Sequence, residues 1–440
     1  MDRQRLQTIG AIALPIIGGM ASQNVLNLVD TAMVGTLGDA ALAAVGMGSF
    51  ANFMAQAFIT GMAAGVQATA ARRLGEERLS ETAVPLNGGL LLAIALAVPW
   101  ALLLVSQADF LFPLLNDDPA VIAIGVPYFA VRLLGMVGVG CNYAFRGYWN
   151  GVNLSRLYLR TLLVMHATNI VLNYLLIFGA LGFPELGAVG AGWASTIATY
   201  VGTATYVFLG LRHARAGGFL SALPSVAEMK TMLGISAPAG LQQFLFAAGY
   251  TALFWIVGLV GTSELAAANV VLNVTLVGVL PGLGLGLAAA SLVGQALGRG
   301  DPDDAEAWGW DVARVAMVVI LLIGLPMLLV PGPVLGVFLE DPSTIAIGAP
   351  VLRLAGATLF IDGLGLVLLN ALLGAGASRS VMGVAVSTQW GIGLVGAYVA
   401  GPVLGGGLLG IWGAQVAYRV TQAAIFATIW RRRQWAAIQV

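Results

Sequence analysis

Residues 118–127 read DPAVIAIGVP, and residues 341–350 read DPSTIAIGAP. Seven of the ten positions are identical, and the second segment follows the first at an offset of 223 residues. The same offset of 223 relates other pairs, including Pro15 with Pro238, Gly38 with Gly261, Gly61 with Gly284, Gly151 with Gly374 and Arg156 with Arg379. Matches at one constant spacing, some of them at proline and charged positions, indicate an internal duplication. The chain is therefore predicted to consist of two homologous halves.

The composition predicts that both halves lie in a membrane. Of the 440 residues, 59% are hydrophobic and 9% are charged, whereas about a quarter of the residues of an average soluble domain are charged. Apolar stretches of about 20 residues, long enough for a helix to cross a bilayer, recur along the whole chain. Twelve spans are expected, near residues 8–35, 42–70, 86–108, 120–145, 156–179, 186–211, 229–258, 265–296, 307–331, 343–371, 380–401 and 406–430.

Twelve spans in two equal halves place six helices in each half. Because six is an even number, the two halves keep the same orientation, and a pseudo-two-fold axis along the membrane normal is expected to relate them. The predicted fold is an all-α integral membrane protein of two six-helix lobes. We expect an N-terminal lobe over residues 1–211, a cytoplasmic interlobe linker over 212–228 and a C-terminal lobe over 229–440.

The basic residues of the loops predict the orientation. They gather in every second loop and at the chain ends, among them Arg72, Arg73, Arg78, Arg212, Arg215, Arg299, Arg379 and Arg431 to Arg433. The intervening loops contain acidic residues and no Lys or Arg. Because cytoplasmic loops of membrane proteins are enriched in basic residues, both termini are expected to be cytoplasmic. The first apolar run is expected to remain as an uncleaved helix in a bacterial inner membrane.

Several classes of function are excluded by what the sequence lacks. It contains no GxxxxGK[ST] motif for ATP, and Cys141 is the single cysteine, without metal-ligand spacing around it. Arg residues are dispersed rather than interleaved with aromatic residues, which argues against nucleic acid as a partner. The protein is therefore expected not to be an enzyme, and to have neither catalytic residues nor a metal or organic cofactor.

Polar residues in the first and fifth spans predict a hydrophilic site in the N-terminal lobe. They follow helical spacing and are Gln23, Asn27 and Asp30 in the first span, and His166, Asn169 and Asn173 in the fifth. A carboxylate in hydrocarbon costs several kcal/mol unless it faces a cavity or a partner. The two stripes are therefore expected to face each other. Asp30 would then act in a proton relay with Asn169 and Asn173, while the other three residues would contact substrate. The alternative is that Asp30 only cross-links helices through hydrogen bonds.

Asp362 in the tenth span is the second embedded carboxylate. Its counterpart at the repeat offset is Val139, so the two lobes differ in their charged positions. Two roles remain open for Asp362: a contact with the coupling ion or the substrate, or a structural ion pair with Arg353 or Arg419. Further candidates for a substrate pocket in this lobe are Gln242, Tyr250 and Asn273.

Several short segments of the sequence resemble the multidrug and toxic compound extrusion (MATE) family. They are NLVDT at 27–31, MVG at 33–35, FRG at 145–147, NIVLN at 169–173 and LVGQ at 292–295. The resemblance covers essentially the whole chain and looks closest to the DinF-type branch. It implies two lobes around a central cleft that export cationic or amphipathic compounds in exchange for protons or sodium ions. In that branch the first-helix aspartate, here Asp30, is implicated in proton coupling.

Two departures from the family pattern bear on the coupling ion. Some relatives have an aspartate at the position of Asn173, and sodium-coupled NorM-type members have an acidic residue in span seven, where residues 241–258 contain none. Asp362 does match the span-ten aspartate of those members. The coupling ion therefore stays open, with protons favoured and sodium possible. The resemblance also leaves open a lipid-linked oligosaccharide flippase of the same superfamily. The expected partners are small organic molecules and membrane lipids, and the protein is expected to work as a monomer.

Overall fold

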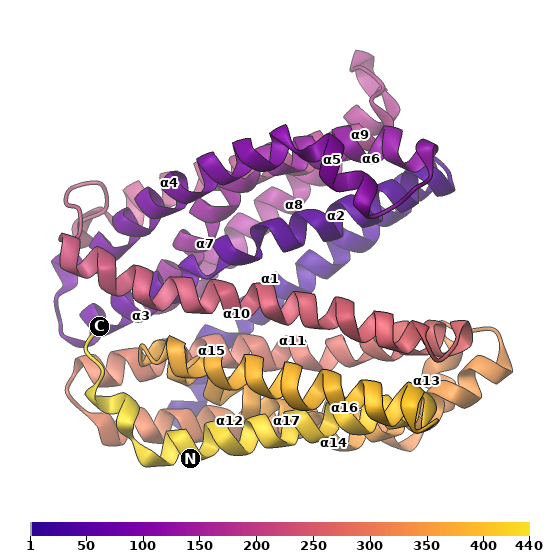
Figure 1. The fold of residues 1–440 in the computed structure, drawn as a ribbon. Coiled ribbons are helices and arrows are strands. Elements are labelled where there is room, and N and C mark those ends of the chain that lie inside the picture. Colours follow the sequence, from indigo (N-terminus) through magenta and orange to yellow (C-terminus); the bar gives the residue numbers. More distant parts are fainter. Residues whose placement is uncertain (1) are drawn as a thin grey trace. The chain divides into compact units, whose positions relative to one another are not determined.

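The computed structural model describes residues 2–440, and almost all of them are helical (Figure 1). No β-strand occurs in this part of the chain. The first nine α-helices are α1 (Arg3–Gly35), α2 (Asp39–Thr60), α3 (Met62–Gly75), α4 (Val84–Ser106), α5 (Ala108–Leu111), α6 (Pro119–Leu134), α7 (Met136–Gly151), α8 (Ser155–Phe178) and α9 (Gly187–His213). The all-α prediction is confirmed.

The second half repeats this order of helices. It contains α10 (Val226–Gly258), α11 (Thr262–Gly298), α12 (Pro302–Leu329), α13 (Pro331–Gly336), α14 (Pro342–Gly374), α15 (Ser378–Val386), α16 (Val395–Tyr398) and α17 (Gly407–Arg432). Two π-helical stretches, η5 (Ser387–Leu394) and η6 (Val399–Val403), flank α16 and make Ser378–Val403 one continuous span. Short 3₁₀ turns at Leu79–Glu81, Phe112–Leu114, Ala180–Gly182, Arg215–Gly217 and Gln434–Ala437 complete the helical elements.

Ten helices of the described residues are long and apolar enough to cross a membrane. The count becomes eleven if α6 and α7, which bend by 45° at Gly135, are taken as one broken span. The remaining long helix is α17, whose 26 residues include the polar Gln415, Arg419 and Gln422. With α17 added, the helices follow the twelve predicted spans in order. The long apolar stretches of the sequence therefore located the spans correctly.

The described residues form two compact units. The N-unit comprises Gly18–Gly240, and the C-unit comprises the residues up to Ile17 together with Leu241–Val440. Consequently α1 and α10 each contribute their first half to one unit and their second half to the other. The units therefore differ from the expected lobes of residues 1–211 and 229–440, and the expected linker at 212–228 lies wholly inside the N-unit.

The two division points are related by the sequence repeat. Ile17 and Gly240 are separated by the offset of 223, and each follows an internal proline, Pro15 or Pro238, by two residues. Proline has no N–H for the helical hydrogen bond to the preceding turn, which weakens the helix locally without ending it here. Both helices continue through their prolines, so the compact units divide inside α1 and α10. The expected lobe and linker bounds stay a prediction.

The crossing helices α1 and α10 are those that pass from one unit into the other. Ion pairs attach the first half of each crossing helix to the unit in which it begins. Arg5 at the start of α1 lies 2.9 Å from Asp304 and 2.8 Å from Asp311, both on α12 of the C-unit. At the repeat-equivalent position, Glu228 at the start of α10 pairs with Arg73 on α3 of the N-unit. Both helices are thus attached by an ion pair near their start, but α1 contributes the basic residue and α10 the acidic one.

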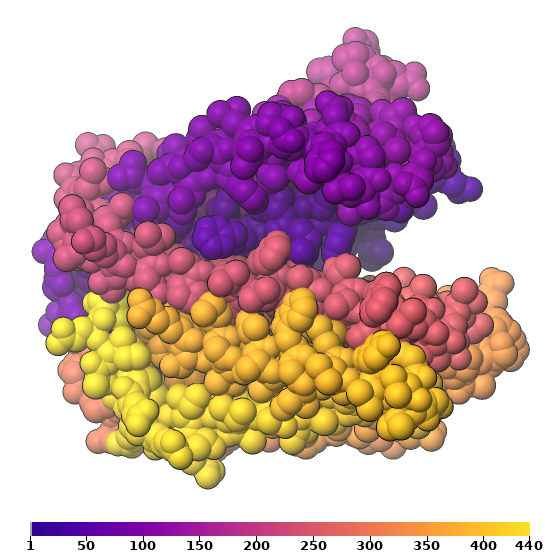
Figure 2. Space-filling view, viewed as in Figure 1, coloured from indigo at the N-terminus to yellow at the C-terminus, as the bar shows by residue number. Residues whose placement is uncertain are grey.

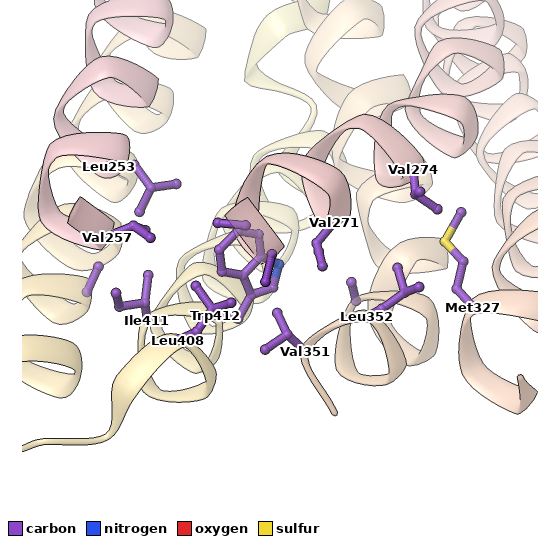
Figure 3. Close-up of a cluster of buried hydrophobic side chains, with 14 of the residues drawn as sticks. Leu253, Val257, Val271, Val274, Met327, Val351, Leu352, Leu408, Ile411 and Trp412 are labelled. Atoms are coloured by element: carbon purple, nitrogen blue, oxygen red, sulfur yellow. The ribbon is translucent and has the colours of Figure 1, made fainter. Parts of the chain in front are cut away.

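Apolar side chains fill the interior of each unit. In the C-unit, Leu253 of α10 belongs to a buried cluster with Val271 of α11, Val351 of α14 and Trp412 of α17 (Figure 3). The second half of α10 runs beside the span Ser378–Val403, as both the ribbon and the space-filling view show (Figures 1 and 2). This packing positions the polar residues of α10, α14 and α17 in the C-unit.

Candidate functional site

Asp30 of α1 meets two asparagines of α8 inside the N-unit. Asn173 Nδ2 donates a hydrogen bond of 2.6 Å to Asp30 Oδ1 and lies 3.0 Å from Asn169 Oδ1. The two asparagines are four residues apart, so they occupy the same face of α8. Their side chains are buried, with Asn173 0% and Asn169 3% exposed. The two sequence stripes therefore do face each other.

The side-chain amide of Asn169 can take two orientations, in which its nitrogen donates to Ser195 or to Asp30. In one orientation its Nδ2 donates to Ser195 Oγ at 3.1 Å. In the other, Nδ2 lies 2.9 Å from Asp30 Oδ1, and Oδ1 accepts from Ser195 Oγ at 3.1 Å and from the Ser195 N–H at 3.2 Å. The second orientation gives an ionised Asp30 two amide donors and also satisfies Ser195. It replaces the hydrogen bond from Asn173 Nδ2 to Asn169 Oδ1 with a contact of 3.0 Å between the two amide nitrogens.

The groups that touch Asp30 are neutral. Asp30 takes part in none of the ion pairs found between residues 2 and 440. The positive charge of Arg132 on α6 acts on Asp30 from beyond ion-pairing distance. The charge of this carboxylate is thus stabilised mainly by amide dipoles.

The polar network extends one turn further along both helices. His166 Nε2 lies 3.1 Å from Gln23 Oε1, and Gln23 Nε2 donates to Asn27 Oδ1 at 3.1 Å. Because Gln23 Oε1 can only accept, His166 carries its proton on Nε2 in this arrangement. His166 is buried, whereas Gln23 and Asn27 are exposed in the chain alone. Gln23 and Asp30 of α1 therefore contact α8, and Asn27 is joined to this interface through Gln23.

Ser195 on α9 is a member of the site that the sequence did not reveal. It holds the amide of Asn169 and so orients one of the donors to Asp30. A single serine in an apolar helix is common, and its spacing matches no stripe. Only the packing of α9 against α8 identifies it.

In the C-unit, Asp362 of α14 pairs with Arg419 of α17. Arg419 Nη1 donates to Asp362 Oδ2 at 2.6 Å, and Arg419 Nη2 lies 3.4 Å from the hydroxyl of Tyr250 on α10. The side chains of Asp362 and Arg419 are 10% and 22% exposed. Arg353, the other partner considered, is exposed elsewhere on α14. The ion pair that the sequence left open is therefore formed with Arg419.

The remaining candidates of this lobe lie apart from one another. Asn273 on α11 donates to Asn269 Oδ1 of the same helix at 2.9 Å. Gln242 is buried near the start of the C-unit half of α10. Of Gln242, Tyr250 and Asn273, it is Tyr250 that the structure brings to the Asp362–Arg419 pair. Between residues 2 and 440 no group of three or more His, Cys, Asp or Glu side chains could hold a metal ion.

This helical architecture is that of a multi-pass membrane protein. A solved structure described as an outward-facing conformation of a multidrug resistance MATE family transporter of the MOP superfamily matches with a TM-score of 0.89 and 22% identity, over 99% of this chain and 97% of that chain. A MATE structure in the straight conformation matches with a TM-score of 0.89 and 21% identity, over 98% and 96%. At these identities the likeness shows the fold.

The family follows from the sequence matches. The MatE family model matches residues 15–175 and 238–399, two segments whose starts differ by the repeat offset of 223. The multidrug resistance protein NorM of Burkholderia vietnamiensis is 30% identical over 433 residues, covering 96% of this chain and 92% of the relative. A probable multidrug resistance protein NorM of Synechococcus is 28% identical over 429 residues, covering 93% and 90%.

The chain belongs to the MatE family. It is therefore a multi-pass membrane transporter and not an enzyme, as predicted. The two matched segments also confirm the internal duplication. The assignment to the DinF-type branch stays a prediction, because the relatives reported above are named NorM. Nothing in the comparisons supports the alternative of an oligosaccharide flippase.

Proposed function

We propose that this protein is a proton-coupled antiporter that exports cationic or amphipathic small molecules by alternating access. The observation that carries the proposal is the Asp30 carboxylate, which is embedded between membrane helices and held by neutral amide donors. The substrate class is suggested by the relatives, which are named multidrug resistance proteins.

The surroundings of Asp30 favour a proton over a sodium ion. The amide nitrogens of Asn173 and, in its second orientation, Asn169 point at the carboxylate. A bound sodium ion would require both amides to turn their oxygens toward Asp30, because carboxylate and carbonyl oxygens are the groups that hard cations prefer, whereas a proton requires only one amide to turn. N–H donors instead suit a carboxylate that alternates between its charged and neutral forms.

The site also contains an acceptor for the protonated acid. Asn173 Oδ1 is buried and accepts no hydrogen bond in the described part of the protein. If the Asn173 amide rotates, this oxygen replaces Nδ2 next to Asp30 and accepts a hydrogen bond from the protonated carboxyl group. The same asparagine therefore serves both protonation states of Asp30.

In the proposed cycle a proton from outside neutralises Asp30, and the α1–α8 interface rearranges so that substrate leaves. Loss of the proton to the cytoplasm then resets the site. This direction of transport assumes that both termini are cytoplasmic and that the protein lies, as a monomer among lipids, in a bacterial inner membrane. No bound cofactor takes part.

The test is transport of ethidium in vesicles that contain the purified protein, driven by an imposed proton gradient or, separately, by a sodium gradient. We expect the wild type to respond to the proton gradient and the Asp30→Asn variant to lose transport. Asp39→Asn makes the same chemical change at an exposed position and should retain it.

Two outcomes would overturn the proposal. One is normal proton-driven transport by Asp30→Asn. The other is a wild type that transports only under the sodium gradient. Equal recovery of Asp30→Asn and Asp39→Asn in monodisperse form excludes misfolding as the cause of a loss.

A further inference from the structure

The guanidinium of Arg419 lies among oxygen atoms inside the C-unit. Asp362 Oδ2 accepts from Nη1 at 2.6 Å, and the Tyr250 hydroxyl lies 3.4 Å from Nη2. These two oxygens come from α14 and α10. A negative charge and a hydroxyl group thus contact one positive charge.

The fold does not require this ion pair. The repeat-equivalent positions of Asp362 and Arg419 in the N-unit are Val139 and Thr196, neither of which is charged. Thr196 instead donates to the carbonyl oxygen of Val131 at 2.9 Å. Because the same helices pack in the N-unit without the pair, its presence in the C-unit points to a role other than assembly of the helices.

A buried ion pair also gains little stability over apolar residues of similar size, because both charges must be removed from water. Ionisable residues within membrane helices are generally functional for the same reason. The oxygen atoms around Arg419 are of the type that binds hard cations, namely one carboxylate and one hydroxyl group. Without Arg419 these oxygens would have one uncompensated negative charge.

We infer that Arg419 determines the coupling ion of this transporter. Its guanidinium takes the place at Asp362 that a sodium ion would otherwise occupy. The C-unit consequently binds no sodium, and coupling is left to Asp30 in the N-unit. This inference rests on the proposed function for its meaning in transport, but the ion selectivity of the Asp362 site is a property of the C-unit alone.

The experiment measures the thermal unfolding of the purified full chain in sodium chloride and in choline chloride at equal ionic strength. All variants carry Asp30→Asn, so that any sodium effect comes from the C-unit. With Arg419 present, the two salts should give the same unfolding temperature. With Arg419→Gln, sodium should raise it by about 2–4 °C in a saturable manner, because a bound ion stabilises the folded state.

Two control variants define the site. Adding Asp362→Asn to Arg419→Gln should abolish the sodium effect, because the charge that attracts the ion is gone. Arg419→Lys keeps a tethered cation and should remain insensitive to sodium. A folded Arg419→Gln protein without a sodium response would overturn the inference. The inference would also be overturned if the protein with Arg419 present responded to sodium and Asp362→Asn removed that response.

Recovery of the variant is itself informative. If Arg419→Gln is recovered only when sodium is present during purification, the inference is supported. If it is recovered in neither salt while Arg419→Gln with Asp362→Asn is recovered in both, the inference fails, because sodium then does not replace the guanidinium. These results do not depend on transport, so a failure of proton-driven efflux would overturn the proposed function alone.

Discussion

The N-unit and the C-unit share one backbone plan but stabilise their partly buried carboxylates in different ways. Asp30 in the N-unit accepts hydrogen bonds from neutral amides, whereas Asp362 in the C-unit is bound to the fixed charge of Arg419. A carboxylate held by neutral donors can gain and lose a proton at modest cost, whereas a fixed cation favours the ionised form. The two repeats therefore share a helical framework but differ in the groups that compensate their carboxylates.

The same comparison explains why the C-unit has no second copy of the Asp30 site. Leu253 stands at the position equivalent to Asp30 and is buried in an apolar cluster. The contact between the neighbouring helices is nevertheless preserved. In the N-unit His166 is hydrogen-bonded to Gln23. At the repeat-equivalent positions of the C-unit, Gln389 Nε2 donates to the carbonyl oxygen of Phe246 at 3.1 Å. The two residues of each pair are 143 positions apart.

The helix that carries these contacts is regular in one unit and distorted in the other. α8 is α-helical throughout, so Asn169 and Asn173 lie on one face. The equivalent segment of the C-unit contains the π-helical stretch Ser387–Leu394, which changes the spacing of side chains around the helix axis. A pair of amides four residues apart would not converge there in the same way.

The largest effect is expected from breaking the charge compensation in the C-unit. Arg419→Met leaves Asp362 buried without its cation, which should lower the free energy of unfolding by about 3–5 kcal/mol in sodium-free buffer. Adding Asp362→Asn removes the stranded charge and should restore most of the loss. Denaturant unfolding of both proteins in detergent measures this difference. Equal stabilities of the single and double variants would show that the pair is not electrostatically coupled.

The next effect concerns the neutral donor in the N-unit. Asn173→Leu removes the 2.6 Å hydrogen bond to Asp30. Hydrogen bonds to charged groups contribute about 1.5–3 kcal/mol, so proton-driven transport should fall about 10- to 100-fold. Asn24→Leu makes the same change at an exposed position of α1 and serves as the control. Rates measured in vesicles under a proton gradient would contradict the assigned role if the two variants matched.

Much of the fold and part of the site could be predicted from the sequence. Span positions follow from apolar length, and the duplication follows from the offset between Pro15 and Pro238. The contact between Asp30 and Asn173 follows from helical spacing, because each residue lies on a polar stripe. These features are properties of the local sequence, so no knowledge of tertiary packing was needed.

Other features depend on how the helices are rotated against one another. The choice of Arg419 over Arg353 as the partner of Asp362 is of this kind, and so is the participation of Ser195. The division of the compact units inside α1 and α10 is a third such feature, because both helices continue through the division points. The π-helical stretch beginning at Ser387 has no distinct composition that would separate it from an ordinary span.

The crossing helices offer a third way to test the comparison. A Cβ atom on Gly240 of α10 would lie 2.2 Å from the backbone oxygen of Phe58, whereas one on Gly19 of α1 would lie 2.7 Å from the ring of Tyr158. A backbone cannot move aside as a ring can. Gly240→Ala should therefore lower the unfolding free energy by about 1–3 kcal/mol, and Gly19→Ala by less. Thermal unfolding of the two variants provides the comparison, and the reverse order would contradict it.

The smallest effect on stability is expected from the helix caps in the best-matched segments, residues 118–127 and 341–350, where the two repeats differ. Asp341 begins α14, and its carboxylate accepts from the hydroxyl groups and backbone N–H groups of Ser343 and Thr344. Asp118 begins α6 in the same way but accepts only from the Ala120 N–H, at 2.8 Å, in the described structure. The hydrogen bonds from Ser343 and Thr344 lower the pKa of Asp341 from 3.8 to about 2.

A lowered pKa in the folded state means that this cap stabilises the protein above pH 3.8 and loses its contribution as the pH falls to about 2. Ser343→Ala with Thr344→Val installs the residues that the first repeat has at 120 and 121, and it removes both hydroxyl donors. The pKa of Asp341 should then move back toward 3.8, so the variant should show a smaller acid-dependent loss of stability. Unfolding temperatures measured from about pH 5 down to about pH 2 test this expectation. Curves of the same shape for wild type and variant would mean that the two repeats cap their helices equally well.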